Sequence, residues 1–329
     1  MLIYYADHFV LPLPPGHRFP MRKYAALRER VAAVAADRMR VPAAATDVEL
    51  ERVHDPAYLR AVIDGTLDPR AQRRIGFPWS AAMVERSRRS AGATLAACRS
   101  ALDSGCGINL AGGTHHAHRA YGEGFCVFND AAVAARSMQA EGRAARVLIL
   151  DLDVHQGDGT AEIFADDASV FTCSLHGRGN FPFRKEASDL DVELADGTGD
   201  DAYLSTLRNA LARSLDRSRP DLVIYLAGAD PYAGDRLGRL ALSKVGLAER
   251  DRHVVATLQD ASIPIAIAMA GGYAESIDDI VDIHFATVAM ALELFAPAGA
   301  GAHPITPTPF PSGIQPAAIM DARTARLVE

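Results

Sequence analysis

The segment 147–159, VLILDLDVHQGDG, constrains the fold more than any other part of the chain. It begins with four apolar residues that include neither a charge nor a turn residue. Such a run is typical of a strand that is buried on both faces in a parallel sheet. Asp151, Asp153, His155 and Asp158 then follow within eight positions. Because side chains alternate along a strand, the first three of these would share one side if the extended conformation persisted.

Two interpretations of this polar segment stay open on its residues alone. Three acceptor side chains that are buried without a partner cost much free energy, and a divalent cation is the simplest partner. Alternatively, the segment is a polar loop that leaves a core strand, and its carboxylates cap a helix that starts near Gly159. A metal-ligand spacing by itself produces false positives. The rest of the chain must therefore decide between the two.

The composition limits the classes of protein to which this chain can belong. The 329 residues fit one large domain or two ordinary ones. Hydrophobic residues make up 49% and charged residues 23%, which is typical of a globular protein with a substantial core. The net charge of −7 argues against direct, general nucleic-acid binding. The four cysteines form no CxxC pair, the N-terminus lacks the pattern of a signal peptide, and no apolar run is long enough to span a membrane. We therefore expect a cytoplasmic protein with reduced thiols and no membrane contact.

Apolar strands alternate with helices through residues 1–296, with no internal repeat and no linker. This alternation predicts one α/β domain in which a parallel sheet is covered by helices on both faces. The predicted strands are 2–5, 107–110, one from Val147, 169–175, 222–228 and 263–270. The predicted helices are 21–39, part of 47–65, 79–105, 129–141, 158–165, 200–217, 244–260 and 277–295.

Three segments lack a periodic pattern. Residues 6–20, with four prolines, are predicted to form a long loop, either at a binding rim or disordered. Residues 177–199 are predicted to be irregular. Residues 297–329 are rich in Ala, Pro and Gly, and we expect a tail that packs on the surface or is partly mobile.

Polar residues that are unusual for a core follow the ends of four predicted strands. In parallel sheets, ligands bind outside the carboxyl ends of the strands. These ends should therefore place their polar residues at one rim of the sheet. The residues concerned are His115, His116, Asp151, Asp153, His155, Asp230 and Tyr273.

The chemistry of this set favours hydrolysis of an amide. Asp153, His155 and Asp230 supply two carboxylates and one imidazole, which suits a zinc ion with a position left open for water or substrate. One of the adjacent His115 and His116 would act as general base and acid.

Three further side chains could support that chemistry. Asp151 and Asp158 are the carboxylates available to orient an imidazole, and Tyr273 offers a hydroxyl to a developing oxyanion. Each residue alone also has a structural explanation: a loop histidine, a turn aspartate or a packed tyrosine.

Four segments of the chain resemble motifs of the zinc-dependent histone deacetylase family, in the same order and spacing. They are GGTHHAHRAYGEGFCVFND, LDLDVHQGDGTAEIF, AGADPYAGDRLGRL and AGGYAES. The resemblance covers about residues 1–296 and implies the arginase-deacetylase fold, a three-layer α/β/α structure with a central, mostly parallel eight-stranded sheet. HQGDG and GHRFPMRKY resemble the class IV-like and bacterial branch more closely than class I.

The resemblance also implies a role for each site residue. The zinc ligands would be Asp153, His155 and Asp230, with Fe²⁺ as an alternative metal. His116 would be the general base and acid, backed by Asp158, and His115 its electrostatic partner, backed by Asp151. Tyr273 would be the oxyanion donor. A potassium ion would be held by Asp151, Asp153 and His155, largely through backbone oxygens.

The substrate implied by the resemblance is an acylated lysine of a protein or peptide. Gly124, Phe125 and Phe181 would line a narrow tunnel for the acyl-lysine, and Gly272 is predicted to bind substrate with them. Leu237 occupies a position where polyamine deacetylases carry a gatekeeping glutamate, so its neutral side chain favours acyl-lysine over acetylpolyamine.

Several alternatives stay open at this point. The same chemistry could act on acetylpolyamines or on lysines with long fatty acyl chains. A metal- or small-molecule-binding protein without turnover is a third hypothesis. The acyl chain length, the metal used in the cell and the oligomeric state, a homo-oligomer included, are not determined by the sequence.

Overall fold

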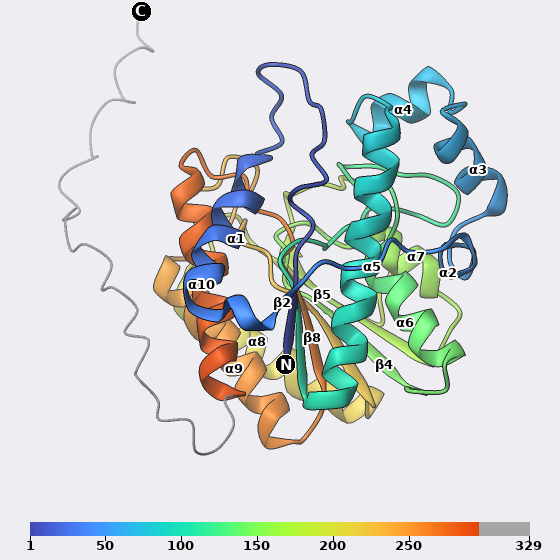
Figure 1. Cartoon of the computed structure of the whole chain (residues 1–329). Helices are drawn as coiled ribbons and strands as arrows, with labels where there is room; N and C mark the ends of the chain where they lie inside the picture. Colours follow the sequence, from blue (N-terminus) through green and yellow to red (C-terminus); the bar gives the residue numbers. More distant parts are fainter. Residues whose placement is uncertain (296–329) are drawn as a thin grey trace, which may run out of the picture.

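The centre of the molecule is an eight-stranded sheet in the order β2-β1-β3-β8-β7-β4-β5-β6, in which every pairing is parallel (Figure 1). The computed structural model describes residues 1–295. The strands are β1 (Leu2–Tyr4), β2 (Met39–Arg40), β3 (Cys106–Asn109), β4 (Val147–Asp151), β5 (Val170–Gly177), β6 (Leu190–Leu194), β7 (Leu222–Leu226) and β8 (Ile265–Ala268). The predicted eight-stranded sheet is thus confirmed, while the predicted tail 297–329 lies outside the described residues.

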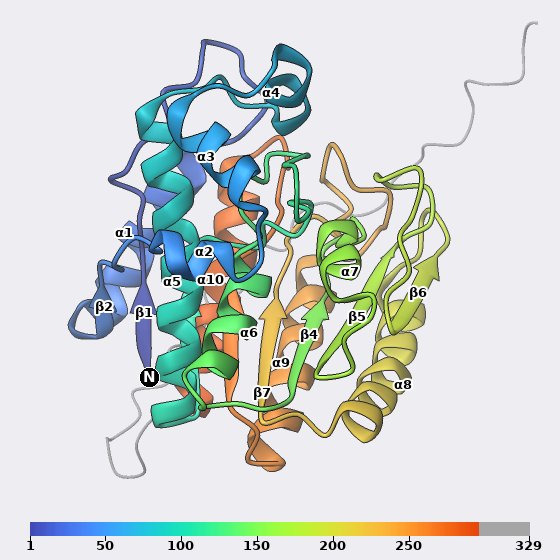
Figure 2. The same cartoon turned by 90° about the vertical axis from the view of Figure 1, so that its right-hand side faces the viewer.

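Helices cover both faces of the sheet (Figure 2). They are α1 (Arg22–Ala35), α2 (Asp47–Glu51), α3 (Pro56–Asp64), α4 (Pro69–Ile75), α5 (Ala81–Ser104), α6 (Asp130–Ala140), α7 (Asp158–Phe164), α8 (Asp200–Ser218), α9 (Lys244–Asp260) and α10 (Ile277–Leu294). Leu148 and Leu150 of β4 point into one core with α1, α8, α9 and α10, and Val147 and Ile149 point into the other with α5 and α6. This alternation, repeated along β7 and β8, explains why these strands are apolar throughout.

The structure refines three predicted segments and adds one helix that was not predicted. Residues 177–199 contain the strand β6. The helix predicted over 21–39 ends at Ala35, where a short 3₁₀ turn (Ala36–Arg38) leads into β2. Residues 47–65 form two helices, α2 and α3, and α4 has no counterpart among the predicted elements. Both α3 and α4 begin with an Asp-Pro pair whose carboxylate accepts from the first turn's amides, and both end at a glycine with positive φ.

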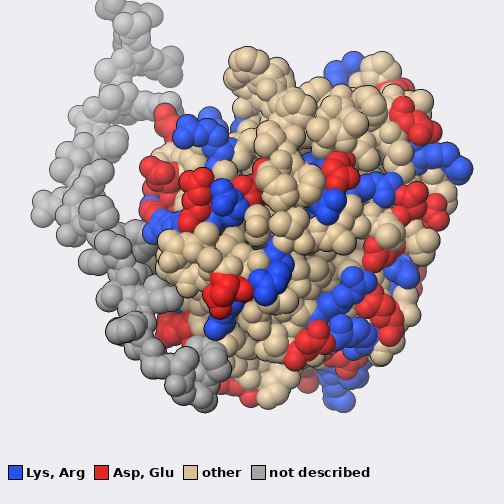
Figure 3. Space-filling model, viewed as in Figure 1, with Lys and Arg blue, Asp and Glu red and all other residues tan. Residues whose placement is uncertain are grey.

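The described surface carries charges of both signs. In the view of Figure 3, Lys and Arg side chains are interspersed with Asp and Glu and form no continuous field of one sign. None of the helices within residues 1–295 combines the length and apolar character that crossing a membrane requires. The cytoplasmic location stays a prediction.

Candidate active site

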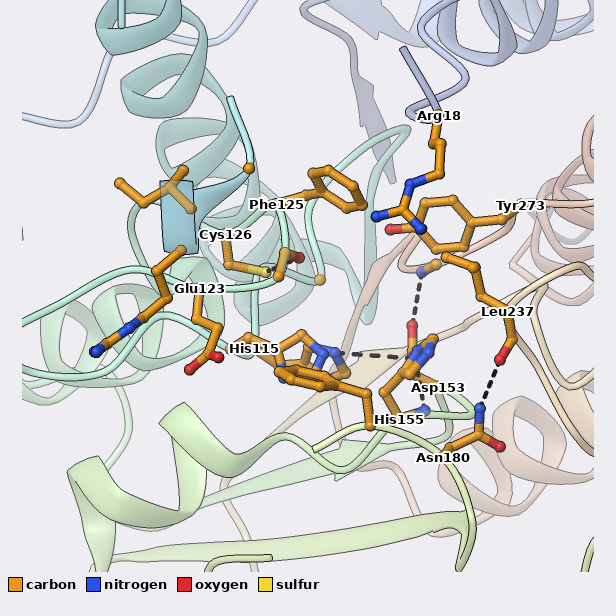
Figure 4. A pocket seen from close by; sticks show the side chains of 18 of the residues that line it. Arg18, His115, Glu123, Phe125, Cys126, Asp153, His155, Asn180, Leu237 and Tyr273 are labelled. Carbon is orange, nitrogen blue, oxygen red and sulfur yellow. Dashed lines mark hydrogen bonds and ion pairs between the residues drawn. The ribbon is translucent and has the colours of Figure 1, made fainter. Parts of the chain in front are cut away.

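The predicted catalytic and metal-binding residues follow the carboxyl ends of β3, β8, β7 and β4, which are neighbours in the sheet. They adjoin a cavity of about 760 Å³ (Figure 4). The predicted residues that line it are His115, His116, Gly124, Phe125, Asp153, His155, Phe181, Leu237 and Tyr273. Asp230 lies fully buried beside them, with its carboxylate 3.4 Å from the His155 ring. The expected convergence of four strand ends is therefore found.

Three side chains form a group that could hold a metal ion. The donor atoms of Asp153, His155 and Asp230 all lie within 4.8 Å of one another. His155 Nδ1 lies 2.9 Å from Asp153 Oδ1 and 3.4 Å from Asp230 Oδ2. The backbone amides of Val154 and Gly271 donate to Asp230 Oδ1 over 2.9 Å and to Asp153 Oδ2 over 2.7 Å. The amides thus fix the carboxylates from one side, while Asp230 Oδ2 is buried without a hydrogen-bond partner in the described chain.

The charges of this group fit a divalent cation. Burial, reinforced by the negative charge of Asp153, raises the pKa of Asp230 to about 7. Burial also opposes ionisation of Asp153, but His115 and His155 outweigh it and lower its pKa. Two buried carboxylates this close repel each other unless a cation neutralises them. A donor set of two carboxylates and one imidazole is of the kind that zinc prefers.

A buried arginine, Arg250, stabilises the loops that carry these carboxylates. Arg250 of α9 has no exposed surface and pairs with Asp251 over 2.7 Å. Its Nη1 donates to the carbonyls of Gly228 over 2.7 Å and Leu152 over 3.3 Å. Leu152 directly follows β4, and Gly228 lies two residues after β7. One guanidinium therefore hydrogen-bonds to the ends of both strands. Arg250 was not predicted, since an arginine on a helix ordinarily indicates a solvated face.

His115 and His116 each hold a carboxylate through Nδ1. His115 lies 2.7 Å from Asp151 Oδ2, His116 lies 2.6 Å from Asp158 Oδ1, and the ring centroids are 4.1 Å apart. Burial lowers the pKa of His115, but Asp151 and Asp153 outweigh burial and raise it to about 9. Burial and the charge of His115 lower the pKa of His116 to about 4. The pair therefore combines a charged imidazole with a neutral one.

A third histidine, His118, shares the carboxylate of Asp158, and the sequence analysis gave it no role. Its Nε2 lies 3.3 Å from Asp158 Oδ2 and its Nδ1 lies 3.6 Å from Glu162, while its ring stacks on Tyr121 at 4.2 Å. Burial lowers its pKa, but Asp158 and Glu162 outweigh burial and raise it to about 9. The same contacts also act on the carboxylate. Burial opposes ionisation of Asp158, but His116 and His118 outweigh burial and lower its pKa. The sequence HHAH at residues 115–118 could have indicated that His116 and His118 share one carboxylate.

Tyr273 presents its phenol to the cavity from the segment after β8 (Figure 4). Its backbone is held in place, because its N–H donates to Asp235 over 2.6 Å and its carbonyl accepts from Arg236 over 2.9 Å. Burial and the nearby negative charges of Asp153 and Asp230 raise its pKa well above the usual value. The phenol therefore keeps its proton and is able to donate a hydrogen bond.

The wall near His116 is aromatic and glycine-rich. The Phe181 ring stands edge-on to the His116 ring at 4.9 Å. Gly124 and Phe125 both have positive φ, of 56° and 67°, and a Cβ at Gly124 would lie 2.7 Å from the His116 ring. Glycine is thus needed there for close approach as well as for backbone conformation. Leu237 also lines the cavity, without a charge.

Gly272 differs from the other predicted substrate-binding residues, since it does not line the cavity. A Cβ there would face Ile280, and its carbonyl accepts from the buried Lys23 over 3.2 Å. The preceding Gly271 lines the cavity instead. The predicted potassium site at Asp151 is not tested by the structure.

A histone deacetylase domain model matches residues 17–288. The chain is 47% identical over 286 residues to an uncharacterized protein of Picosynechococcus, covering 86% of this chain and 95% of that protein. It is 32% identical to histone deacetylase 2 of Arabidopsis thaliana and 32% identical to histone deacetylase clr6 of Schizosaccharomyces pombe, covering 71% and 70% of this chain. It spans only 63% and 61% of those two proteins.

A solved structure, the HDA15 HD domain, has the same arginase-deacetylase fold. It matches with a TM-score of 0.72 and 24% identity, covering 90% of each chain. The matched domain takes in all four strand ends that form the cavity. The chain belongs to the histone deacetylase family.

Proposed function

We propose that this protein is a zinc-dependent amidohydrolase that removes acetyl or other acyl groups from lysine side chains of proteins. The observation that carries the proposal is the arrangement around one cavity. A metal-donor group, a neutral histidine, a charged histidine and a protonated tyrosine all adjoin the same space. Membership of the histone deacetylase family supports the same conclusion.

Asp153, His155 and Asp230 would hold the metal. Zinc held by these residues would supply Lewis acidity, which would polarise a substrate carbonyl and make water easier to deprotonate near neutral pH. Fe²⁺ is the alternative metal. We also propose a potassium ion at Asp151, held together with backbone oxygens of Asp153 and His155.

His116 acts as general base and then as general acid. Its Nδ1 is held by Asp158, so Nε2 is the nitrogen that remains for the cavity. Its lowered pKa keeps it neutral at pH 7, so Nε2 accepts a proton from the attacking water and returns it to the departing lysine nitrogen. The charged His115, held by Asp151, stabilises negative charge that develops beside it. The Tyr273 phenol donates a hydrogen bond to the substrate oxygen as that oxygen gains charge.

Phe125 and Phe181 both line the cavity, and their apolar rings suit contact with the methylene chain of an acyl-lysine. Leu237 offers no carboxylate to a second amine, which supports acyl-lysine over an acetylpolyamine. Lysines with long fatty acyl chains are the remaining alternative within this chemistry.

The test is a panel of peptides bearing acetyl-, butyryl- and myristoyl-lysine, run beside acetylspermidine, with and without a chelator. We expect hydrolysis of at least one acyl-lysine peptide, its loss with chelator, and a fall in kcat of about 10² to 10³ for Tyr273→Phe. Tyr232→Phe, which changes a tyrosine outside the cavity, serves as the control. Normal rates in a Tyr273→Phe, His116→Ala double variant would refute the mechanism, and a pronounced preference for acetylspermidine would refute the substrate.

A further inference from the structure

The mouth of the cavity carries more positive than negative charge. Among residues 1–295, four arginines line the cavity, whereas the carboxylates that line it are those of Asp153, in the metal-donor group, and Glu123. The four arginines are Arg18, Arg73, Arg74 and Arg239. This excess is local, because the whole chain has a net charge of −7.

Two of the four arginines already interact with other side chains of the protein. Arg239 pairs with Asp196 over 3.2 Å. The Arg74 guanidinium lies 4.6 Å from the Tyr121 ring and is close enough to Glu123 to influence its charge. The charge of Arg239 is thus offset by Asp196, and that of Arg74 in part by Glu123.

Arg18 and Arg73 are less engaged, although Arg73 lies close enough to Asp68, the N-cap of α4, to favour the ionised form of that carboxyl. Both are exposed, and within residues 1–295 neither has a carboxylate within ion-pair distance. They come from distant segments, Arg18 from the loop before α1 and Arg73 from the last turn of α4. Figure 4 shows Arg18 extending from that loop toward the Tyr273 side of the cavity. Arg73 also complements the dipole of α4, whereas Arg18 forms no ion pair with any carboxylate in the described part of the chain.

The mouth also offers apolar contact to a large partner. Phe183 is 85% exposed, lines the same cavity and stands edge-on to Phe181 at 6.3 Å. Because Phe183 and the arginines are exposed as well as lining the cavity, a polypeptide bound across the cavity could contact them from the solvent side. The outer contacts therefore suit residues that flank the acylated lysine in a polypeptide.

We propose that the mouth selects acyl-lysines whose flanking residues are acidic, with Arg18 and Arg73 as the specificity determinants. This inference rests on the proposed function. Aspartate or glutamate beside the acyl-lysine gains charge-assisted contacts with the two guanidinium groups. A lysine- or arginine-rich flank meets like charge at the same place.

Three acetyl-lysine peptides of equal length test the inference, with four flanking positions occupied by Glu, Gln or Lys. We expect kcat/KM to fall in the order Glu, Gln, Lys, by about tenfold between the extremes, mostly through KM. The difference in kcat/KM between the Glu and Lys peptides should narrow at 1 M salt, where the Debye length is about 3 Å. Arg18→Gln with Arg73→Gln should abolish most of the preference, while Arg208→Gln, the same change on the exposed face of α8, should not.

Equal kcat/KM values, a preference for Lys flanks, or a preference that survives in the double variant would overturn the inference. The proposed function fails separately, if none of the peptides is hydrolysed. In that case, fluorescence anisotropy with the same labelled peptides still decides the inference. Tighter binding of the Glu peptide, lost in the double variant, supports it, and equal binding of the three peptides contradicts it.

Discussion

His115 and His116 are adjacent in sequence and have pKa values shifted in opposite directions, to about 9 and about 4. Both are buried and both bond a carboxylate, so burial and pairing alone do not separate them. The difference comes from the surroundings. His115 faces two carboxylates, Asp151 and Asp153, whereas His116 faces the charge of His115 and a single carboxylate, Asp158.

His118 affects this balance, because it contacts the same carboxylate as His116. Its raised pKa means that it is charged at neutral pH. In His118→Gln, loss of that positive charge leaves the negative charge of Asp158 less compensated, so the pKa of His116 should rise. The acid limb of kcat/KM against pH should then move to higher pH, because His116 must be neutral to accept a proton. His253→Gln, which changes a partly exposed histidine on α9, is the control, and an unmoved acid limb in His118→Gln would show that His118 has no such role.

At the scale of elements, the segment after β8 packs so closely against the metal-donor group that there is no room for a side chain at Gly271. A Cβ at Gly271 would collide with the Oδ2 atoms of Asp230 and Asp153. Gly271→Ala should therefore displace both carboxylates and weaken zinc binding by about 10- to 100-fold, the range typical of disturbed ligand support. Gly199→Ala, where a Cβ meets only a carbonyl at 3.9 Å, is the matched control. Equal zinc affinities of the two variants, measured by competition with a chromogenic chelator, would contradict this account.

His54 connects the turn after α2 with the loop that carries His115 and His116. Its Nδ1–H donates to the His118 carbonyl over 3.0 Å, and its Nε2 accepts from the Asn129 amide over 3.0 Å. These two bonds require the neutral ring, and burial lowers its pKa from 6.5 to about 4.

The folded pKa of His54 is below its unfolded value, so its contribution to stability is complete above about pH 6.5 and is lost as pH falls toward 4. The loss should approach roughly 3 kcal/mol at the acid end. Urea unfolding of the wild type and of His54→Gln at pH 7 and pH 4.5 measures it. The variant should lose less free energy of unfolding between these pH values, and equal losses would exclude His54 as the cause.

At the scale of the whole molecule, the central strands were predictable and the edge strands were not. β4, β7 and β8 are buried on both faces, so their sequences are apolar without interruption. β2 and β6 are the two outermost strands, and only partly buried. β2 has two residues, and β6 carries Asp191 and Glu193 at partly exposed positions. Half-exposed edge strands lack an apolar run, so the sequence offers no pattern by which to find them.

The same reasoning separates the predicted parts of the site from the parts that were missed. Residues that directly follow buried strands, such as Asp153 and Asp230, could be placed because parallel strands end at one rim. Arg250 and Arg18 reach that region from a helix and a long loop, and no local pattern says where such side chains point. Their contributions depend on tertiary packing.

The most direct test of the account is a zinc titration of metal-free protein, with release of the acyl group from an acyl-lysine peptide as the readout. The account predicts no hydrolysis without metal and a rate that rises linearly to a plateau at one zinc ion per chain. Asp230→Asn should shift or abolish that plateau, because it removes one donor of the group. Full hydrolysis by the metal-free protein, or a rate that zinc does not change, would contradict the claim that these strand ends form a metal-dependent hydrolytic site.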